Sequence, residues 1–224
     1  YSLHAVEQIG FSPQQVLLDR LMQFTDGELE NYFELVVGSC SEFLSTEIEG
    51  HDWEYRTVSI RSMAIPASDD VREIRNNSVA LLQRLYALNL TVTQKKELLS
   101  GMNGACGIYS RSPMSDEAKI IVEENAVNVL SYWAKLVGSE SLELIQRIEH
   151  DAYWNYYHAS SGEVKSAALE VERAIDANKE YKVYRDQVWF AGIIRCGDET
   201  WETPGYESKR SKGRWRGNDD ADDM

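Results

Sequence analysis

The stretch SDEAKIIVEENAVNVLSYWAKLVGSESLELIQRIEHDAYWNYYH, residues 115–158, decides the fold class of this chain. Its apolar residues recur every three or four positions, the spacing that places them on one side of an α-helix. Ser115, followed by two acidic residues, starts a first helix, and Gly138 ends it. Ser139 then caps a second helix that runs to His158. The stretch therefore predicts two consecutive helices joined by a short turn.

The same periodicity continues on both sides of this stretch. Further helices are predicted over residues 12–24, 28–48, 69–89, 91–102, 163–177 and 181–194. Either Thr91 or Thr93 is expected to cap the helix that follows it. Residues 51–68 alternate apolar and polar side chains only in part, so a loop is favoured there over a short extended segment. The sequence thus predicts an all-α chain.

The spacing of the helices suggests how they are arranged. Helices open near Asp70, Ser115 and Glu163, at intervals of about 45 and 48 residues, and each is preceded by a partner helix. This period is typical of antiparallel helix pairs stacked as a HEAT- or armadillo-like solenoid, with an irregular helical bundle as the alternative. We expect a helical-repeat domain over residues 1–197 and a mobile charged tail over residues 198–224.

Composition narrows the class of protein. The chain has 224 residues, of which 43% are hydrophobic and 27% charged, values typical of a folded globular protein. No apolar run reaches the 18 or so residues that a membrane span needs. The cysteines Cys40, Cys106 and Cys196 are far apart and odd in number, so reduced thiols in a cytoplasmic protein are expected. The first residue is Tyr1 rather than Met, which suggests a piece of a longer protein.

The body of the chain and its carboxyl-terminal end differ in net charge. The net charge is −14, and residues 1–207 alone amount to about −15. A body this acidic repels phosphate backbones, so its surface is not expected to bind nucleic acid. A basic run with an interleaved tryptophan follows, and four aspartates come after it. Nucleic-acid binding through this run is an alternative function, and its residues would be Lys209, Arg210, Lys212, Arg214, Trp215 and Arg216.

No motif for catalysis, a cofactor or a metal is found in the sequence. His150 and His158 are two helical turns apart, about 12 Å along the axis, which is too far to share a metal ion. With Trp154 between them they form a stripe that we expect to pack against neighbouring helices. The string Gly101, Gly104 and Gly107 follows a helix rather than a strand, so it marks a helix end and not a phosphate loop. Catalytic, cofactor and metal residues are therefore not assigned, and catalysis by this segment is not expected.

Exposed aromatic residues are the best candidates for binding, because aromatics supply most of the binding energy of protein interfaces. We predict a non-catalytic protein-binding or sensing module that uses Trp133, Tyr153, Trp154 and Tyr157. The alternative is a domain that senses a small ligand or nucleotide in a pocket lined by Trp133, Tyr153 and Arg147.

Two segments resemble a known family. Val71-Arg72-Glu73-Ile74-Arg75 leading into 81–86, and 178–185 followed by Trp189-Phe190, look like helices of the helical-repeat regions of large bacterial P-loop NTPases of the STAND type. The resemblance implies that this segment senses a partner or ligand, while a separate NTPase domain acts as the switch. The chain itself has no Walker motif, so the resemblance supplies no catalytic residues.

Overall fold

The computed structural model describes residues 13–45, 69–106 and 116–186. These residues form helices and turns, and no strand occurs among them. The prediction of an all-α chain is confirmed for the described residues. Contacts divide the chain into two compact units, residues 1–175 and 176–224. The first unit contains the helices described below. In the second unit, residues 179–186 are helical.

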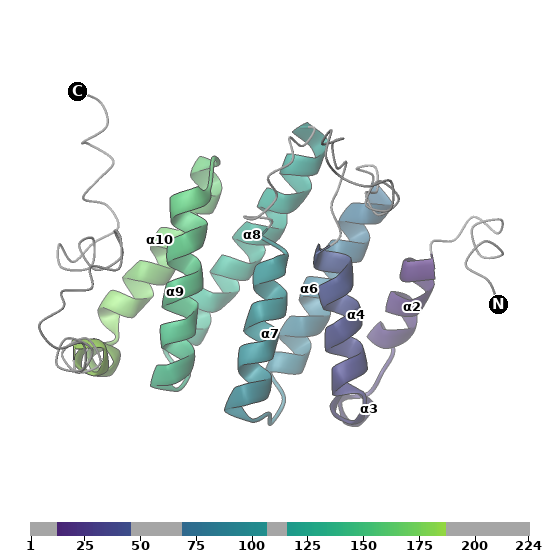
Figure 1. Cartoon of the computed structure of the whole chain (residues 1–224), viewed down its shortest axis with the longest axis horizontal. Helices are drawn as coiled ribbons and strands as arrows, with labels where there is room; N and C mark the ends of the chain where they lie inside the picture. The colour runs from purple at the N-terminus through teal and green to yellow at the C-terminus, as the bar shows by residue number, and fades with distance from the viewer. Residues whose placement is uncertain (1–12, 46–68, 107–115, 187–224) are drawn as a thin grey trace, which may run out of the picture. The chain divides into compact units, whose positions relative to one another are not determined.

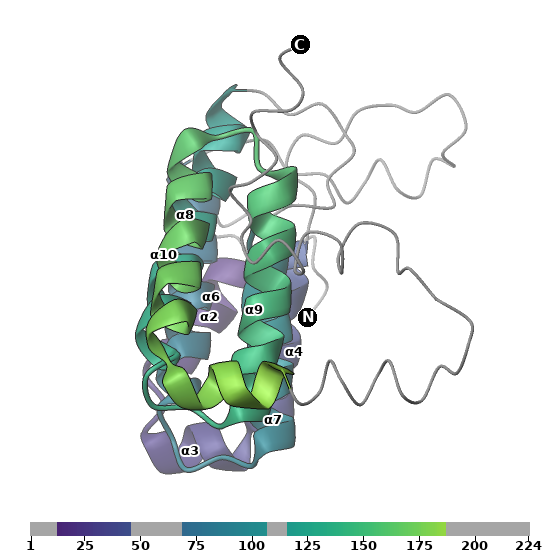
Figure 2. The ribbon, with the colours of Figure 1, turned by 90° about the vertical axis from the view of Figure 1, so that its left-hand side faces the viewer.

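The helices of the first unit lie in two rows that pack against each other (Figure 1). Helices α4, α7 and α9 lie side by side in one row, and α2, α6 and α8 in the other. Their bounds, with those of the short α3 and of α10, are α2 Pro13–Met22, α3 Asp26–Asn31, α4 Phe33–Ser45, α6 Asp69–Tyr86, α7 Val92–Gly104, α8 Asp116–Leu136, α9 Leu142–His158 and α10 Gly162–Ala177. Figure 2 shows the two rows edge on. None of the helices within 13–45, 69–106 and 116–186 is long and apolar enough to cross a membrane.

Two helix starts show how local chemistry sets the bounds. Thr25 caps α3 and Thr91 caps α7, each through a capping box with the side chain three residues later. In the first box, the hydrogen bonds from the backbone and side chain of Thr25 lower the pKa of Glu28. The prediction that Thr91 or Thr93 caps α7 is confirmed for Thr91.

Two predicted helix bounds are wrong. The single helix expected over 28–48 is divided at Tyr32, whose φ of −108° and ψ of 25° end α3 before α4 begins. The predicted cap Ser139 lies in the preceding turn, and Ser141 is the N-cap residue of α9. In both cases the apolar spacing locates the helix but does not locate the residue whose backbone leaves the helical region. The expected loop over 51–68 lies outside the described residues.

The core of the first unit is formed by the inward faces of the two rows. Leu82 of α6 and the adjacent Leu98 and Leu99 of α7 are fully buried there. Gly101 of α7 faces α4 and α6 closely, since a Cβ at this position would meet Ser41 Oγ at 3.0 Å and Leu82 Cδ1 at 3.4 Å. The small residue therefore lets the three helices pack at this distance.

A buried arginine joins four of these helices. Arg75 of α6 is only 3% exposed. Its guanidinium donates to the carbonyl oxygens of Leu44 at 2.8 Å and Ala105 at 3.0 Å, and to Asn125 Oδ1 at 3.0 Å. The two carbonyls lie at the carboxyl ends of α4 and α7, where the helix dipoles favour a cation. Burial lowers the pKa of Arg75 to about 10, and these acceptors offset that cost.

Further polar contacts join helices of the same row. In one row, Gln83 Nε2 of α6 donates to Asn128 Oδ1 of α8 at 3.1 Å. In the other row, Asn155 Nδ2 of α9 donates to Asn103 Oδ1 of α7 at 3.0 Å. Each pair connects residues 45–52 positions apart in the sequence. In both rows these contacts fix the position of one helix along its axis relative to the next helix.

Candidate functional site

Helix α9 differs from its neighbours in the polarity of its buried face. Glu149, Asp151 and Asn155 are 4%, 2% and 1% exposed. Buried polar side chains are uncommon and cost free energy unless they are hydrogen-bonded, so their presence calls for a role. Two of the three, Asp151 and Asn155, organise the residues around them.

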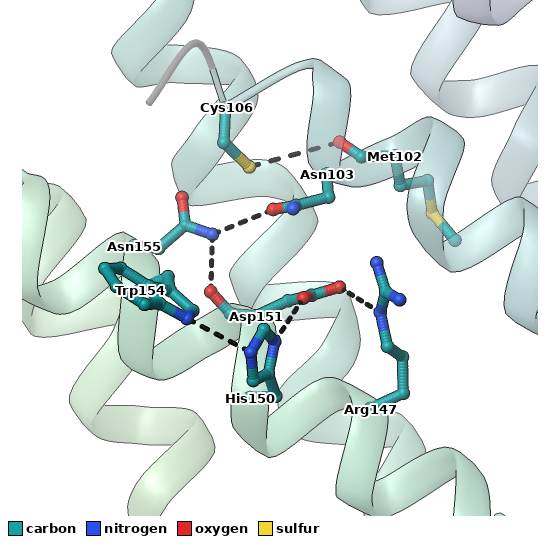
Figure 3. Close-up of polar contacts among 8 residues, drawn as sticks. All are labelled: Met102, Asn103, Cys106, Arg147, His150, Asp151, Trp154 and Asn155. Carbon is teal, nitrogen blue, oxygen red and sulfur yellow. Dashed lines mark hydrogen bonds and ion pairs between the residues drawn. The ribbon is translucent and has the colours of Figure 1, made fainter. Parts of the chain in front are cut away.

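The buried carboxylate of Asp151 holds two neighbours on its own helix (Figure 3). Its Oδ2 accepts a hydrogen bond from Arg147 Nε at 2.6 Å, and its Oδ1 lies 2.9 Å from His150 Nδ1. Arg147 compensates the negative charge of Asp151, and this ion pair offsets part of the free energy that burial of the carboxylate costs. Both side chains that Asp151 holds extend toward the surface of α9, where they are about half-exposed.

A tryptophan completes this chain of contacts. Trp154 Nε1 donates to His150 Nε2 at 3.1 Å (Figure 3). An indole N–H can only donate, so Nε2 is the acceptor and the ring proton of His150 lies on Nδ1, which donates to Asp151. The Asp151–His150 pair thus holds the indole N–H of Trp154 through Nε2.

Asn155 connects this group to α7. Besides its bond to Asn103, its Nδ2 donates to the carbonyl oxygen of Asp151 at 2.8 Å. Cys106, just after α7, lies on the same side and is buried (Figure 3). Burial, together with the nearby charge of Asp151, raises the pKa of the Cys106 thiol to about 12. Its thiol is therefore not a nucleophile at neutral pH.

The outer face of α9 presents a row of rings, His150, Trp154, Tyr157 and His158, which we call the α9 stripe. The rings of Trp154 and His158 are stacked at 4.9 Å with an interplanar angle of 7°. Tyr157 packs edge-on against His158 at 5.2 Å and is stacked on Tyr153 at 6.2 Å. Tyr157 is 55% exposed and Trp154 is half-buried. The stripe is a surface of rings held in place by one another.

The expectation that Trp133 and Tyr153 are exposed is wrong. Trp133 is fully buried and Tyr153 is only 7% exposed. Trp133 lies one turn after Val129 and Leu130 on the inward face of α8, so the packing of the two rows covers it. Of the four predicted contact residues, only Trp154 and Tyr157 reach the surface. The expectation that the stripe of His150, Trp154 and His158 packs against neighbouring helices is wrong for the two histidines, which are exposed, whereas Trp154 is half-buried.

The sequence also raised two alternatives, a small-ligand pocket and nucleic-acid binding through a basic run. Trp133 is enclosed by the core, so it does not line an open pocket with Tyr153 and Arg147. The basic run 209–216 lies outside the described residues. Among the residues that the structure describes, no group of three His, Cys, Asp or Glu side chains could hold a metal ion.

The polar group beneath the stripe was not anticipated from the sequence. Asp151 and Asn155 stand at the helical spacing of the apolar residues Ile148 and Ala152, so their burial had a signal in the periodicity. Their partners did not, because Asn103 lies 52 residues away on another helix.

Comparison with protein-family models, with curated proteins and with solved structures gave no match.

Proposed function

We propose that this chain is a non-catalytic, protein-binding helical module whose contact surface is the α9 stripe. The observation that supports the proposal is the orientation of Trp154. Its indole N–H is bonded to His150, which is in turn bonded to a buried carboxylate, and its ring is stacked on His158. Holding this half-buried ring on two sides costs side-chain entropy that packing of the core does not require.

Such a ring is well suited to binding. Tryptophan and tyrosine are enriched among the residues that dominate binding energy, and rigid rings lose little conformational entropy when a partner covers them. Trp154 and Tyr157 are both restrained before any partner arrives. The free energy gained by covering them is therefore not spent on ordering them.

The module itself is proposed to be a stack of helix pairs. Seven of the nine buried positions of α6 recur as buried positions of α8 47 residues later, and six of the eight of α8 recur in α10 46 residues later. The residues in the first comparison are Val71, Ile74, Arg75, Ser78, Val79, Leu82 and Tyr86, which correspond to Ala118, Ile121, Val122, Asn125, Ala126, Val129 and Trp133. A common inward register supports stacked pairs over an irregular bundle, in which successive helices need not share one.

The resemblance to helical-repeat regions of STAND-type NTPases stays a prediction. It agrees with a stack of helix pairs that presents one helix of each pair to a partner. The sensing role that it implies would use the same outer face of α9.

Selection from a random peptide library displayed on phage tests the proposal. Peptides selected on the full chain should bind a Trp154→Ser, Tyr157→Ser double variant at least about tenfold more weakly, since each ring is expected to contribute about 1 kcal/mol or more. The control is Ile120→Ser, which removes a 47% exposed apolar side chain from α8 in the other row. It should leave the dissociation constant unchanged.

Circular dichroism of each variant checks that the helices are intact. Selected peptides that bind the double variant as tightly as the native chain would place the contact surface elsewhere. A selection that yields no binders would argue against a protein-binding role.

A further inference from the structure

We propose that the segment recognised by the α9 stripe is a basic, extended peptide, with one Lys or Arg side chain over Trp154 and a second at Glu97 of α7. The proposal rests on the proposed function and specifies the chemistry of the partner. It follows from how the charges of α4, α7 and α9 are paired.

The cations of this row are already engaged. Over the residues of α4, α7 and α9, the Lys and Arg side chains are Lys95, Lys96 and Arg147. Lys95 pairs with Glu140 at 2.9 Å, Lys96 pairs with Glu143, and Arg147 pairs with Asp151. The row therefore offers no uncompensated positive charge to an acidic partner.

Two carboxylates of the same row, one on α4 and one on α7, remain outside these ion pairs. Glu97 of α7 and Glu34 of α4 are exposed, and neither has an ion-pair partner within 13–45, 69–106 and 116–186. The row is thus net negative at its surface, in a chain whose net charge is −14. Charge complementarity selects a cationic partner.

The rings add a second preference for cations. An ammonium or guanidinium group over the face of a tryptophan or tyrosine is attracted by the ring quadrupole, and guanidinium groups also stack on such rings. The chain uses this interaction internally, since the ammonium groups of Lys95 and Lys165 lie over Tyr86 and Tyr156 at 4.9 and 5.8 Å. Trp154 and Tyr157 offer the same kind of ring at the surface.

The positions of α7 and α9 relative to each other set the distance between the two proposed contacts, at Trp154 and at Glu97. The bond between Asn103 and Asn155 places the carboxyl end of α7 level with Trp154. Glu97 lies six residues before Asn103, which is about 9 Å along the helix axis. Glu97 is one turn before Gly101, which faces α4, so a peptide bound at both contacts crosses the outer face of α7 over Ser100 and Gly104. At Gly104 an added Cβ would meet only open space. Packed helix axes are about 8–10 Å apart, so the two contacts are about 13 Å or more apart when the axial offset is included. An extended chain covers about 3.3 Å per residue, so cations about four or five residues apart would reach both contacts.

Fluorescence anisotropy with defined peptides tests the proposal on the full chain. The probe is a labelled peptide of alternating Arg and Ser, and a peptide of alternating Glu and Ser is its counterpart. The Arg–Ser peptide should bind, and the Glu–Ser peptide should not. Trp154→Leu and Glu97→Gln should each weaken binding of the Arg–Ser peptide by about two- to fivefold, the range for an exposed cation–π contact or ion pair. Trp154→Phe, which keeps a ring, should retain most of the affinity.

The matched control is Glu170→Gln, because it changes the net charge by the same amount as Glu97→Gln. Glu170 is exposed on α10, outside the row of α4, α7 and α9. Equal losses in the two variants would mean that an acidic chain attracts any polycation, and would overturn the proposal.

The outcomes also separate this proposal from the one on which it rests. If library-selected peptides depend on Trp154 and Tyr157 but are neutral or acidic, the stripe binds protein and the basic partner is wrong. If selected peptides ignore the stripe, the proposed function itself fails.

Discussion

Helices α7 and α9 occupy successive places in the same row, yet their buried faces differ in kind. Buried positions of α7 recur in α9 50 residues later. The five corresponding pairs are Leu98 and Ile148, Leu99 and Glu149, Gly101 and Asp151, Met102 and Ala152, and Ala105 and Asn155. The α7 member is apolar or glycine in each pair, whereas three of the α9 members are polar. The buried positions therefore have the same spacing in both helices, but the buried side chains of α9 are more polar.

The difference identifies α9 as the helix of this pair whose buried side chains lower the stability of the fold. A polar side chain in the core costs free energy that an apolar one would not. In α9 hydrogen bonds of Asp151 offset part of that cost and orient His150 and Trp154 at the surface, whereas the buried Oδ1 of Asn155 accepts no hydrogen bond from the described residues. On α7 the outer positions next to them are small residues, which need no support from within. We infer that the buried face of α7 serves only the frame, by which we mean the packed inward faces of the two rows, whereas the buried face of α9 also orients side chains of the proposed binding surface.

The largest loss of stability is expected from removing the buried hydrogen bonds of Arg75, which support the core that both helices share. Arg75→Leu should lower the free energy of unfolding by about 3–5 kcal/mol, because it leaves two buried helix-terminal carbonyls and Asn125 Oδ1 without their donor. Urea denaturation followed by circular dichroism measures the change.

The control for this substitution is Arg84→Leu on the same helix. Arg84 pairs with Asp26 at the surface, and an exposed ion pair is worth about 1 kcal/mol or less. Losses of equal size would show that burial of the Arg75 bonds adds nothing.

The frame was largely predictable from the sequence because its signals are local. The spacing of Ile121, Val122, Val129 and Leu130 defines the inward face of α8 without knowledge of any other helix. Trp133 continues that same face, so its burial could have been read from the spacing, and assigning it to the surface overlooked this. Aromatic character alone does not distinguish a core residue from a contact residue.

The polar group under the stripe was beyond sequence reasoning for a different reason. His150 and Trp154 are one turn apart, so their contact was foreseeable in principle. The helical spacing indicates that Asp151 lies on the buried face, but the contacts of the polar group beyond α9 depend on how α7 packs against α9 and on Asn103, 52 residues before Asn155. Helix pairing at a distance is not encoded in any local pattern.

The comparison of α7 with α9 is sharpened by moving a residue from one helix to the other. Gly101→Asp gives α7 the residue of α9 at the same register, but with no Arg147 equivalent, since Glu97 stands at that position. A Cβ there already meets Ser41 Oγ at 3.0 Å, so the substitution adds crowding to an unpaired carboxylate. We expect a loss of about 2–3 kcal/mol in unfolding free energy.

The same change in α4 is the control for this experiment. Gly38→Asp introduces the carboxylate where an added Cβ would meet nothing within 4 Å. Its unfolding free energy should stay within about 0.5 kcal/mol of the native value, as for most surface substitutions. A similar loss at both positions would mean that a carboxylate in this row, rather than its burial at Gly101, is harmful.

The smallest effect tests the connection between the core of α9 and its surface. Asp151→Asn keeps the shape of the side chain but leaves a single acceptor oxygen for two donors, Arg147 Nε and His150 Nδ1. The expected loss is about 1–2 kcal/mol in unfolding free energy. The control Glu143→Gln, on the same helix as Asp151, weakens an exposed ion pair with Lys96 of α7 and should cost under about 0.5 kcal/mol.

The informative readout is the indole N–H of Trp154, observed by NMR. When Asp151 no longer fixes the Nδ1–H form of His150, Nε2 is free to carry the proton and can no longer accept from the indole. The indole N–H of Trp154 should then exchange with solvent faster in Asp151→Asn than in the native chain or in Glu143→Gln. Unchanged exchange in Asp151→Asn would mean that stacking on His158 alone holds the ring, and that the buried carboxylate of α9 supports the helix rather than the binding surface.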